Sequence, residues 1–167
     1  MEFTAESFNI FNRDWALVTA GTEGNYNTMT ISWGGLGTLW GKPVATVYVK
    51  PVRHTHAFLE SNEFFTVSFF PPEYREALGL LGTLSGRDGD KVAQAGLTPV
   101  FLDKAVTFRE ARATLLCKKI YRHDLDPAEI PAGAKQAFYT SEAPHTMYLG
   151  EVVEILKEYQ PRTPGCV

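Results

Sequence analysis

The residues Val44-Ala45-Thr46-Val47-Tyr48-Val49, followed by Lys50 and Pro51, decide the expected fold class. β-Branched and aromatic side chains dominate this run, and such residues are enriched in strands. The proline ends the run, because proline has no N–H to donate to a strand ladder. The sequence therefore predicts a strand over residues 44–49 and a change of direction directly after it.

Similar runs recur along the chain on both sides of this strand. They lie at residues 14–20, 26–33, 64–70, 113–121 and 147–156. Gly34, Gly35 and Gly37 are expected to break the strand that precedes them. Residues 126–133 hold two prolines and a glycine, and we expect a surface loop there.

Short helices are expected at residues 54–61, 73–82 and 90–95. Asp90 is a suitable N-cap for the third of these helices, and Gly96 is its expected stop. The strands follow one another without regular alternation with helices, which favours an antiparallel barrel with helices packed outside. We therefore expect a mainly β chain with short α-helical connections, forming one domain over residues 1–167.

Composition excludes several classes of function. The chain has 167 residues, 44% of them hydrophobic, and a formal net charge of -3. Without a basic excess, nucleic-acid binding is not expected. No apolar run approaches the ~20 residues of a membrane span, and the N-terminus lacks the basic start of a secretory signal. We expect a cytoplasmic protein. Cys117 and Cys166 have no metal-ligand spacing, so neither a metal site nor a disulfide is predicted.

The expected strand at residues 26–33 is unusually polar. Alternate side chains of a strand share a face, so Thr28, Thr30 and Ser32 line one side, while Asn27 and Trp33 lie on the other. Hydroxyl groups can donate to phosphate or to ring carbonyl oxygens. The alternative is a polar stripe that faces solvent.

A second candidate site joins the strand at residues 44–49 to the helix after it. Helix N-termini bind phosphate through free N–H groups and a partial positive charge. Arg53 adds a planar fork suited to phosphate, Lys50 a point charge and Thr55 a hydroxyl. The alternative is a capped helix with a surface salt bridge.

A third candidate is the loop Gly82-Thr83-Leu84-Ser85-Gly86-Arg87-Asp88-Gly89-Asp90-Lys91. Glycine, Ser85 and two cations precede a short helix, and backbone N–H groups in such loops can form an anion nest. The spacing is not that of a P-loop. A solvated loop is the alternative.

These stretches together resemble one known family, the flavin reductase-like (flavoredoxin) proteins with the FMN-binding split β-barrel, a Greek-key-like antiparallel barrel. The motifs are Asn-Thr-x-Thr-x-Ser-Trp at 27–33, Val-x-Pro-x-Arg-x-Thr at 49–55, Gly-x-x-Ser-Gly-Arg-Asp-x-Asp-Lys at 82–91 and Tyr-x-Gly-Glu-Val at 148–152. They occur in this order, and the resemblance spans roughly residues 9–156.

The resemblance implies a homodimer with FMN held non-covalently near the seam between subunits. Asn27 and Trp33 would lie near the flavin ring, and Arg53 and Thr55 would hold the phosphate. The other implied contacts come from Thr28, Thr30, Ser32, Ser85 and Lys91.

The resemblance also points to a reductant. In related reductases a histidine near the position of His145 lies on the nicotinamide side of the flavin, although His145 could equally be a loop histidine in water. NADH or NADPH would be the hydride donor. Hydride transfer to a flavin needs no protein acid or base, so no catalytic residue is predicted.

Three functions remain open from the sequence. The first is an NAD(P)H-dependent flavin reductase that transfers hydride between nicotinamide and flavin. The alternative is a non-enzymatic, flavoredoxin-like electron carrier with a protein redox partner. The third is a barrel that keeps only the scaffold and holds haem or no cofactor, because a fold does not fix a function.

Overall fold

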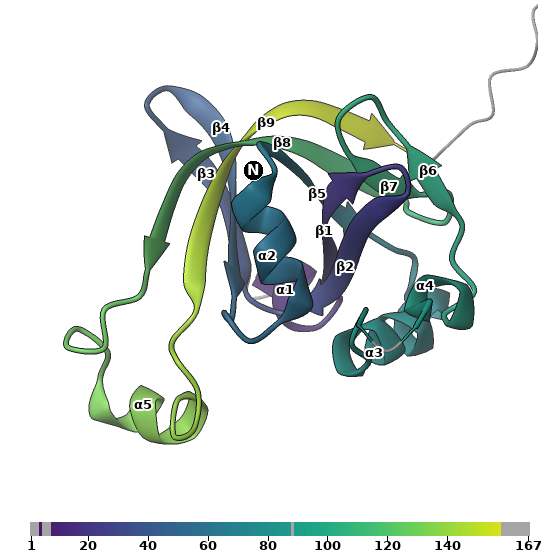
Figure 1. Cartoon of the computed structure of the whole chain (residues 1–167). Coiled ribbons are helices and arrows are strands. Elements are labelled where there is room, and N and C mark those ends of the chain that lie inside the picture. Colours follow the sequence, from purple (N-terminus) through teal and green to yellow (C-terminus); the bar gives the residue numbers. More distant parts are fainter. Residues whose placement is uncertain (1–3, 5–7, 88, 158–167) are drawn as a thin grey trace, which may run out of the picture.

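A curved antiparallel sheet of seven strands forms the framework of the molecule (Figure 1). The structure, a computed structural model, describes residues 4, 8–87 and 89–157. The strand order is β2-β1-β5-β8-β9-β4-β3, and every neighbouring pair is antiparallel. The expected mainly β, antiparallel fold class is confirmed. The strands of this sheet are β1 (Ala16–Thr22), β2 (Asn25–Ile31), β3 (Gly34–Leu39), β4 (Lys42–Val49), β5 (Phe64–Phe69), β8 (Ala113–Asp124) and β9 (Thr146–Lys157).

Short helices and one small hairpin surround this sheet. The hairpin is formed by β6 (Pro99–Phe101) and β7 (Val106–Phe108). The helices are α1 (Asn9–Asn12), α2 (His54–Ser61), α3 (Arg75–Thr83), α4 (Lys91–Gln94) and α5 (Ala132–Phe138), with a 3-10 turn, η2 (Pro72–Tyr74), before α3.

Strand β4 and helix α2 form where the sequence predicts them. Along β4, Val47 and Val49 are fully buried while Tyr48 is half-buried, which is the alternation of a strand with one face on the core. Helix α2 has the expected bounds and ends at Asn62, whose side-chain amide donates to the Phe58 carbonyl. The direction of the chain thus changes between β4 and α2 within a few residues.

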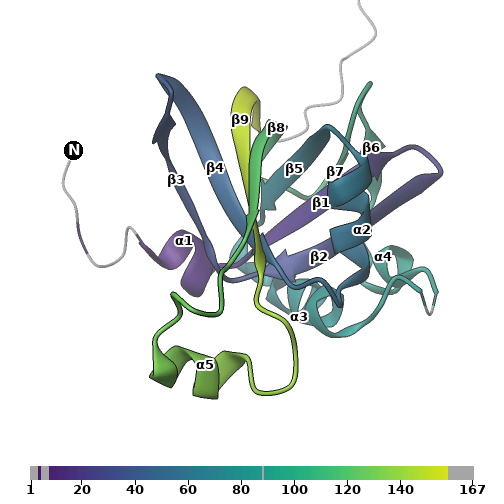
Figure 2. The same cartoon turned by 60° about the vertical axis from the view of Figure 1, so that its left-hand side comes forward.

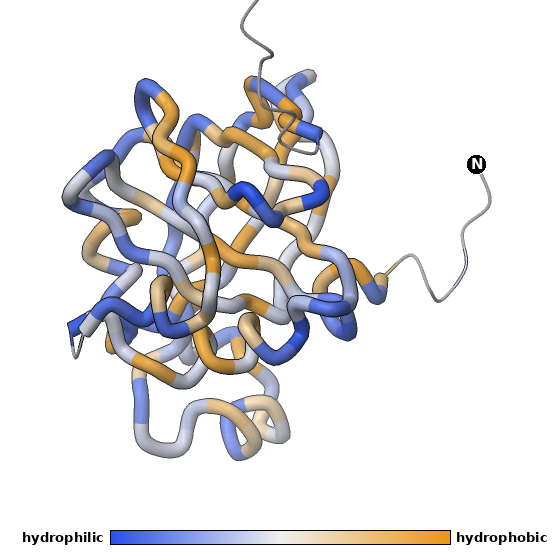
Figure 3. The backbone as a smooth tube through the Cα atoms, turned by 90° about the vertical axis from the view of Figure 1, so that its right-hand side faces the viewer, coloured by the Kyte–Doolittle hydropathy of each residue, from blue (hydrophilic) through white to orange (hydrophobic). Residues whose placement is uncertain are grey.

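The sheet buries apolar side chains on both of its faces. Val47, Phe65 and Tyr148 belong to the cluster enclosed by the curved sheet, and Cys117 lies among them as a fully buried thiol. On the outer face, Leu78 and its neighbours pack between the sheet and the helices α3 and α4. Many of the hydrophilic stretches lie at turns around the periphery (Figure 3).

The barrel is open between its two edge strands, β2 and β3. Helix α2 packs against β1 and β2, and α3 packs against β2. Beyond the barrel, the long strands β8 and β9 lead to a segment that projects from the sheet (Figures 1 and 2). We call this segment, residues 125–145 with α5 in it, the arm.

The structure corrects three details of the expected elements. The strand expected at residues 26–33 ends at Ile31, as β2, and Gly34, Gly35 and Gly37 after it form a strand of their own, β3, because β4 supplies a complete ladder of partners. The expected loop at residues 126–133 runs into α5, which begins at Ala132. The short strands β6 and β7 were not expected.

Among the described residues, no helix is long and apolar enough to cross a membrane. Burial raises the pKa of the Cys117 thiol to about 12, as a core position requires. Cys166 and Asp88 lie outside the described residues.

Candidate functional site

The three candidate segments lie against one another. Asn27, on β2, donates from Nδ2 to Oγ1 of Thr55 at 2.7 Å. A Cβ atom at Gly86 would lie 2.0 Å from Oδ1 of the same asparagine. Only a glycine can approach this closely, so the loop before α4 is held directly against β2 and the first turn of α2.

Arg53 ties the start of α2 to the end of α3. It occupies the N-cap position with an extended backbone, and its Nη2 donates to the Gly82 carbonyl at 2.7 Å. Burial lowers the pKa of the guanidinium, but an arginine remains charged in proteins. The cation is therefore fixed beside the free N–H groups of the first helical turn.

Lys91 is the most unusual charged group of the cluster. Its side chain is on the first turn of α4, the residue is only 4% exposed, and Nζ donates to the Leu84 carbonyl at 3.1 Å. Burial, and then the charge of Arg53, lowers its pKa to about 8. Within the described part of the chain no carboxylate pairs with it. A buried ammonium with only carbonyl partners favours a complementary anion.

The rest of this cluster is also cationic. Ser85 accepts a hydrogen bond from the backbone N–H of Arg87 at 3.2 Å, which shapes the loop. Arg87 in turn donates to the Val52 carbonyl at 3.4 Å. Burial, and then the charges of Arg87 and Lys91, lowers the pKa of His54. Positive charge is thus concentrated where α2 and the loop before α4 meet.

Two of the expected hydroxyl ligands are already engaged within the fold. Thr28 is fully buried and shares a hydrogen bond of 2.8 Å with Thr19 on the neighbouring strand. Thr30 donates to the Leu78 carbonyl at 2.5 Å and so fastens α3 to β2. The polar face of β2 is therefore covered by a helix and does not face solvent.

A second group of candidate residues lies where β2 ends and the arm returns to the barrel. The ring of Trp33 is 4.8 Å from that of His145 and 5.0 Å from that of Phe138. Ser32, Trp33 and Tyr139 help to line a cavity of about 400 Å³. This second group of candidate residues is therefore aromatic, whereas the group where α2 meets the loop before α4 is cationic.

His145 is neutral at physiological pH. Burial, and then the nearby charge of Lys50, lowers its pKa to about 4. Its Nδ1 atom shares a hydrogen bond of 2.8 Å with the Tyr139 hydroxyl. The imidazole can therefore exchange hydrogen bonds with a ligand without bringing a charge to it.

Lys50 connects the two groups through the arm. Its Nζ lies 2.7 Å from Oε2 of Glu142 and donates to the Phe138 carbonyl at 3.1 Å. A hydrogen bond from Lys50, followed by the charges of Lys50 and Arg53, lowers the pKa of Glu142. Glu142 is therefore held in its charged form beside Lys50.

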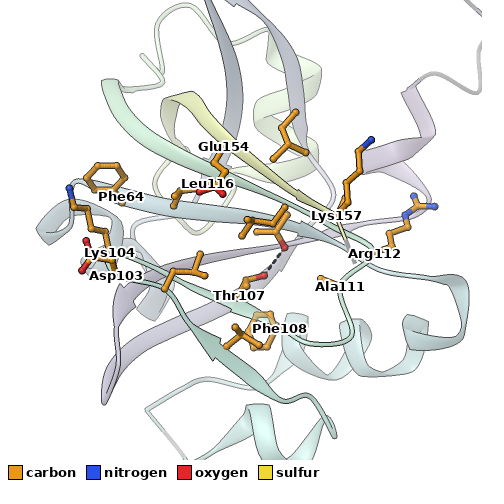
Figure 4. Close-up of a pocket in the computed structure, with 16 residues that line it drawn as sticks. Phe64, Asp103, Lys104, Thr107, Phe108, Ala111, Arg112, Leu116, Glu154 and Lys157 are labelled. Atoms are coloured by element: carbon orange, nitrogen blue, oxygen red, sulfur yellow. Dashed lines mark hydrogen bonds between the residues drawn. The ribbon is translucent and has the colours of Figure 1, made fainter. Parts of the chain in front are cut away.

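The candidate residues form a row rather than one enclosed pocket. Asn27, on β2, lies at the cationic end, and Trp33, just after β2, lies at the aromatic end. A larger open cavity, of about 1380 Å³, lies between β8, β9 and the β6–β7 hairpin (Figure 4). None of the candidate residues lines it.

Sequence reasoning missed the groups that complete the row. Gly86 lies within a quoted motif, but its contact with Asn27 depends on how two distant segments pack. Glu142, Phe138 and Tyr139 lie in the arm, where no motif marks them. The described residues hold no cluster of histidine, cysteine or carboxylate side chains arranged to bind a metal.

Comparison with known proteins identifies the family. The sequence profile described as "Flavin reductase like domain" matches residues 8–164. The chain belongs to the flavin reductase-like family. No curated protein sequence matches it significantly.

Solved structures of flavin reductase-like proteins share the fold. An FMN-binding protein from Thermus thermophilus, solved with bound 1-cyclohex-2-enone, is 21% identical with a TM-score of 0.69, over 95% of this chain and 78% of that one. A flavoredoxin from Methanosarcina acetivorans is 19% identical with a TM-score of 0.69, over 96% and 76%. An NADH:FAD oxidoreductase from Streptomyces globisporus is 19% identical with a TM-score of 0.66, over 91% and 80%.

Proposed function

We propose that this flavin reductase-like protein binds FMN non-covalently along β2 and acts as an NAD(P)H-dependent flavin reductase. The observation that carries the proposal is the buried, carboxylate-free Lys91 next to Arg53, at one end of a row that ends in aromatic side chains. FMN has its groups in a matching order, with a phosphate at one end and a flat ring at the other. We further propose that the protein works as a cytoplasmic homodimer.

The residues present fit FMN at both ends of the row. Arg53 and Lys91 supply two fixed cations for a phosphate, and the first turn of α2 supplies N–H groups. At the other end, Trp33 and His145 offer ring faces next to a cavity. The hydroxyls of Thr28 and Thr30 serve this site by fixing β2 against β1 and α3.

The protein's part in the proposed reaction is positioning. When bound, FMN supplies a ring that accepts hydride from a nicotinamide, so the chain need not supply an acid or a base. Trp33 and Phe138 would exclude water from one end of the ring. His145, neutral because of its lowered pKa, would orient the nicotinamide by hydrogen bonding without attracting an anion.

Anaerobic reduction tests this function. NADH or NADPH is added to the FMN-loaded protein, and the long-wavelength absorbance of the flavin is followed. We expect the absorbance to fall within seconds to minutes of adding one of the two nucleotides. If neither nucleotide bleaches the bound flavin, the reductase proposal fails.

A second candidate is an electron carrier that exchanges electrons with a protein partner. The structural likeness to flavoredoxins, including that of Desulfovibrio vulgaris at 21% identity and a TM-score of 0.68, favours it. A carrier would hold FMN firmly and would be reduced by a partner protein but not by either nucleotide. The same anaerobic experiment therefore separates the two candidates.

A further inference from the structure

The Glu142 carboxylate forms an ion pair with a cation of the candidate site. It lies 2.7 Å from Nζ of Lys50, and its charge also acts on Arg53. Arg53 is one of the two cations to which the proposed function assigns the FMN phosphate, and its backbone N–H donates to the Lys50 carbonyl at 3.0 Å. We propose that Glu142 is a built-in competitor of that phosphate and sets the affinity of the site for phosphorylated flavin. This inference rests on the proposed function.

The contacts of Lys50 argue against a purely structural role for Glu142. Lys50 also donates to the Phe138 carbonyl at 3.1 Å and lies over the Tyr139 ring, 5.6 Å from its centre. The Phe138 ring in turn packs edge-on against Trp33. The arm is therefore attached to the barrel by contacts that do not involve Glu142.

The ion pair is exposed enough to be exchanged. The Glu142 side chain is 40% exposed and that of Lys50 is 23% exposed. Pairs in such surroundings are weak, because water screens both charges. A phosphate arriving at Arg53 meets a like charge on Glu142, and this repulsion is relieved only when Glu142 moves away or is neutral.

The decisive variant is Glu142→Gln, which keeps the shape and the hydrogen-bonding capacity of the side chain and removes its charge. Dissociation constants are measured by flavin fluorescence for FMN and for riboflavin, which has the same ring without the phosphate. We expect FMN to bind about threefold to fivefold more tightly to the variant at low salt. Riboflavin should bind equally to both proteins, and the gain for FMN should shrink at high salt.

A matched control removes a charge from the same arm. Glu129 is exposed, and among the described residues its carboxylate pairs with no cation. Glu129→Gln should leave the FMN dissociation constant unchanged within about twofold. A gain as large as that of Glu142→Gln would show a general charge effect and would overturn the inference.

The remaining outcomes separate this inference from the proposed function. If the wild type binds FMN and Glu142→Gln binds it no more tightly, Glu142 is not a competitor, while the proposed function stands. An equal gain for riboflavin would place the effect at the ring and would also overturn the inference. If neither the wild type nor the variant binds FMN, the proposed function fails and the inference fails with it.

Discussion

Lys91 is the residue at which folding and ligand binding make opposite demands. Its ammonium is almost fully buried without a carboxylate, and burial disfavours the charged form. A site that must attract an anion benefits from the same isolated charge. Natural proteins commonly accept local destabilisation of this kind at functional sites.

The pKa of Lys91 predicts how FMN binding depends on pH. Its pKa, about 8, lies below the usual 10.5, so the ammonium is charged at pH 7 and loses its proton as the pH rises through 8. The FMN phosphate keeps its charge over this range, because its second pKa is about 6. We therefore expect the FMN affinity to fall between about pH 7 and pH 9. Fluorescence titrations at several pH values measure this.

Two variants check that Lys91 is the titrating group. Lys91→Met should weaken FMN binding at pH 7 by about 1.5–3 kcal/mol and should remove the pH dependence. Arg53→Ala should weaken binding by a similar amount but keep the pH dependence, because Lys91 still titrates. A wild-type affinity that stays constant to pH 9 would contradict the prediction.

At the level of single residues, the sequence predicted the cations of the site but not the carboxylate of Glu142 that lies among them. Arg53 and Lys91 lie in motifs whose resemblance to a family could be recognised, and the structure brings them together. Glu142 could not be found in this way, and the contact of Gly86 with Asn27 could not be predicted although Gly86 lies in a motif, because both contacts arise only when distant segments pack. A glutamate in an unmarked segment looks like any solvated surface charge.

Among the elements, β3 shows why glycine alone is a poor guide to where a strand ends. The sequence Gly34-Gly35-Leu36-Gly37 has weak strand propensity, yet β4 pairs with it residue by residue. Tertiary contacts therefore override the local preference. A Cβ at Gly34 would lie 2.7 Å from the Phe11 ring, so one reason for a glycine here is the packing of α1.

This packing makes a prediction about two adjacent glycines of β3. Gly34→Ala should destabilise the protein by about 1–3 kcal/mol, because the new methyl group collides with Phe11 and with the Thr46 carbonyl. Gly35→Ala, whose methyl would meet nothing within 4 Å, should be neutral or stabilise the protein by about 0.5 kcal/mol. Urea unfolding followed by tryptophan fluorescence measures both. Equal losses in the two variants would show that strand propensity, not packing, decides.

The arm was missed as an element for a different physical reason. The sequence of helix α5 carries no clear apolar stripe, which agrees with the finding that the helix buries none of its residues. Its position is set by contacts of the arm with two residues of the barrel, Lys50 and Trp33. Neither contact could be predicted from local periodicity, although both involve residues that the motifs already marked.

For the molecule as a whole, the sequence was sufficient to predict the class of fold but not the two edge strands between which the barrel is open. Successive strands that do not alternate with helices indicate an antiparallel barrel. The resemblance to flavin reductase-like proteins indicated that this barrel is a split barrel. Which two strands have a partner on one side only is decided by the full set of pairings, in which β2 and β3 become the edges. Edge strands with exposed apolar side chains require cover or carry a risk of aggregation.

Exposed residues on β3 and in the turn after it lead to the prediction of a homodimer. Leu36 is 52% exposed and Trp40 is 67% exposed, although both are large and apolar. We expect analytical ultracentrifugation to give about twice the chain mass of 18.6 kDa. Leu36→Lys should shift the protein towards monomer by burying a charge in the contact, whereas Gln94→Lys, on the exposed side of α4, should not. A wild-type protein that sediments as a monomer at micromolar concentration would contradict the assembly.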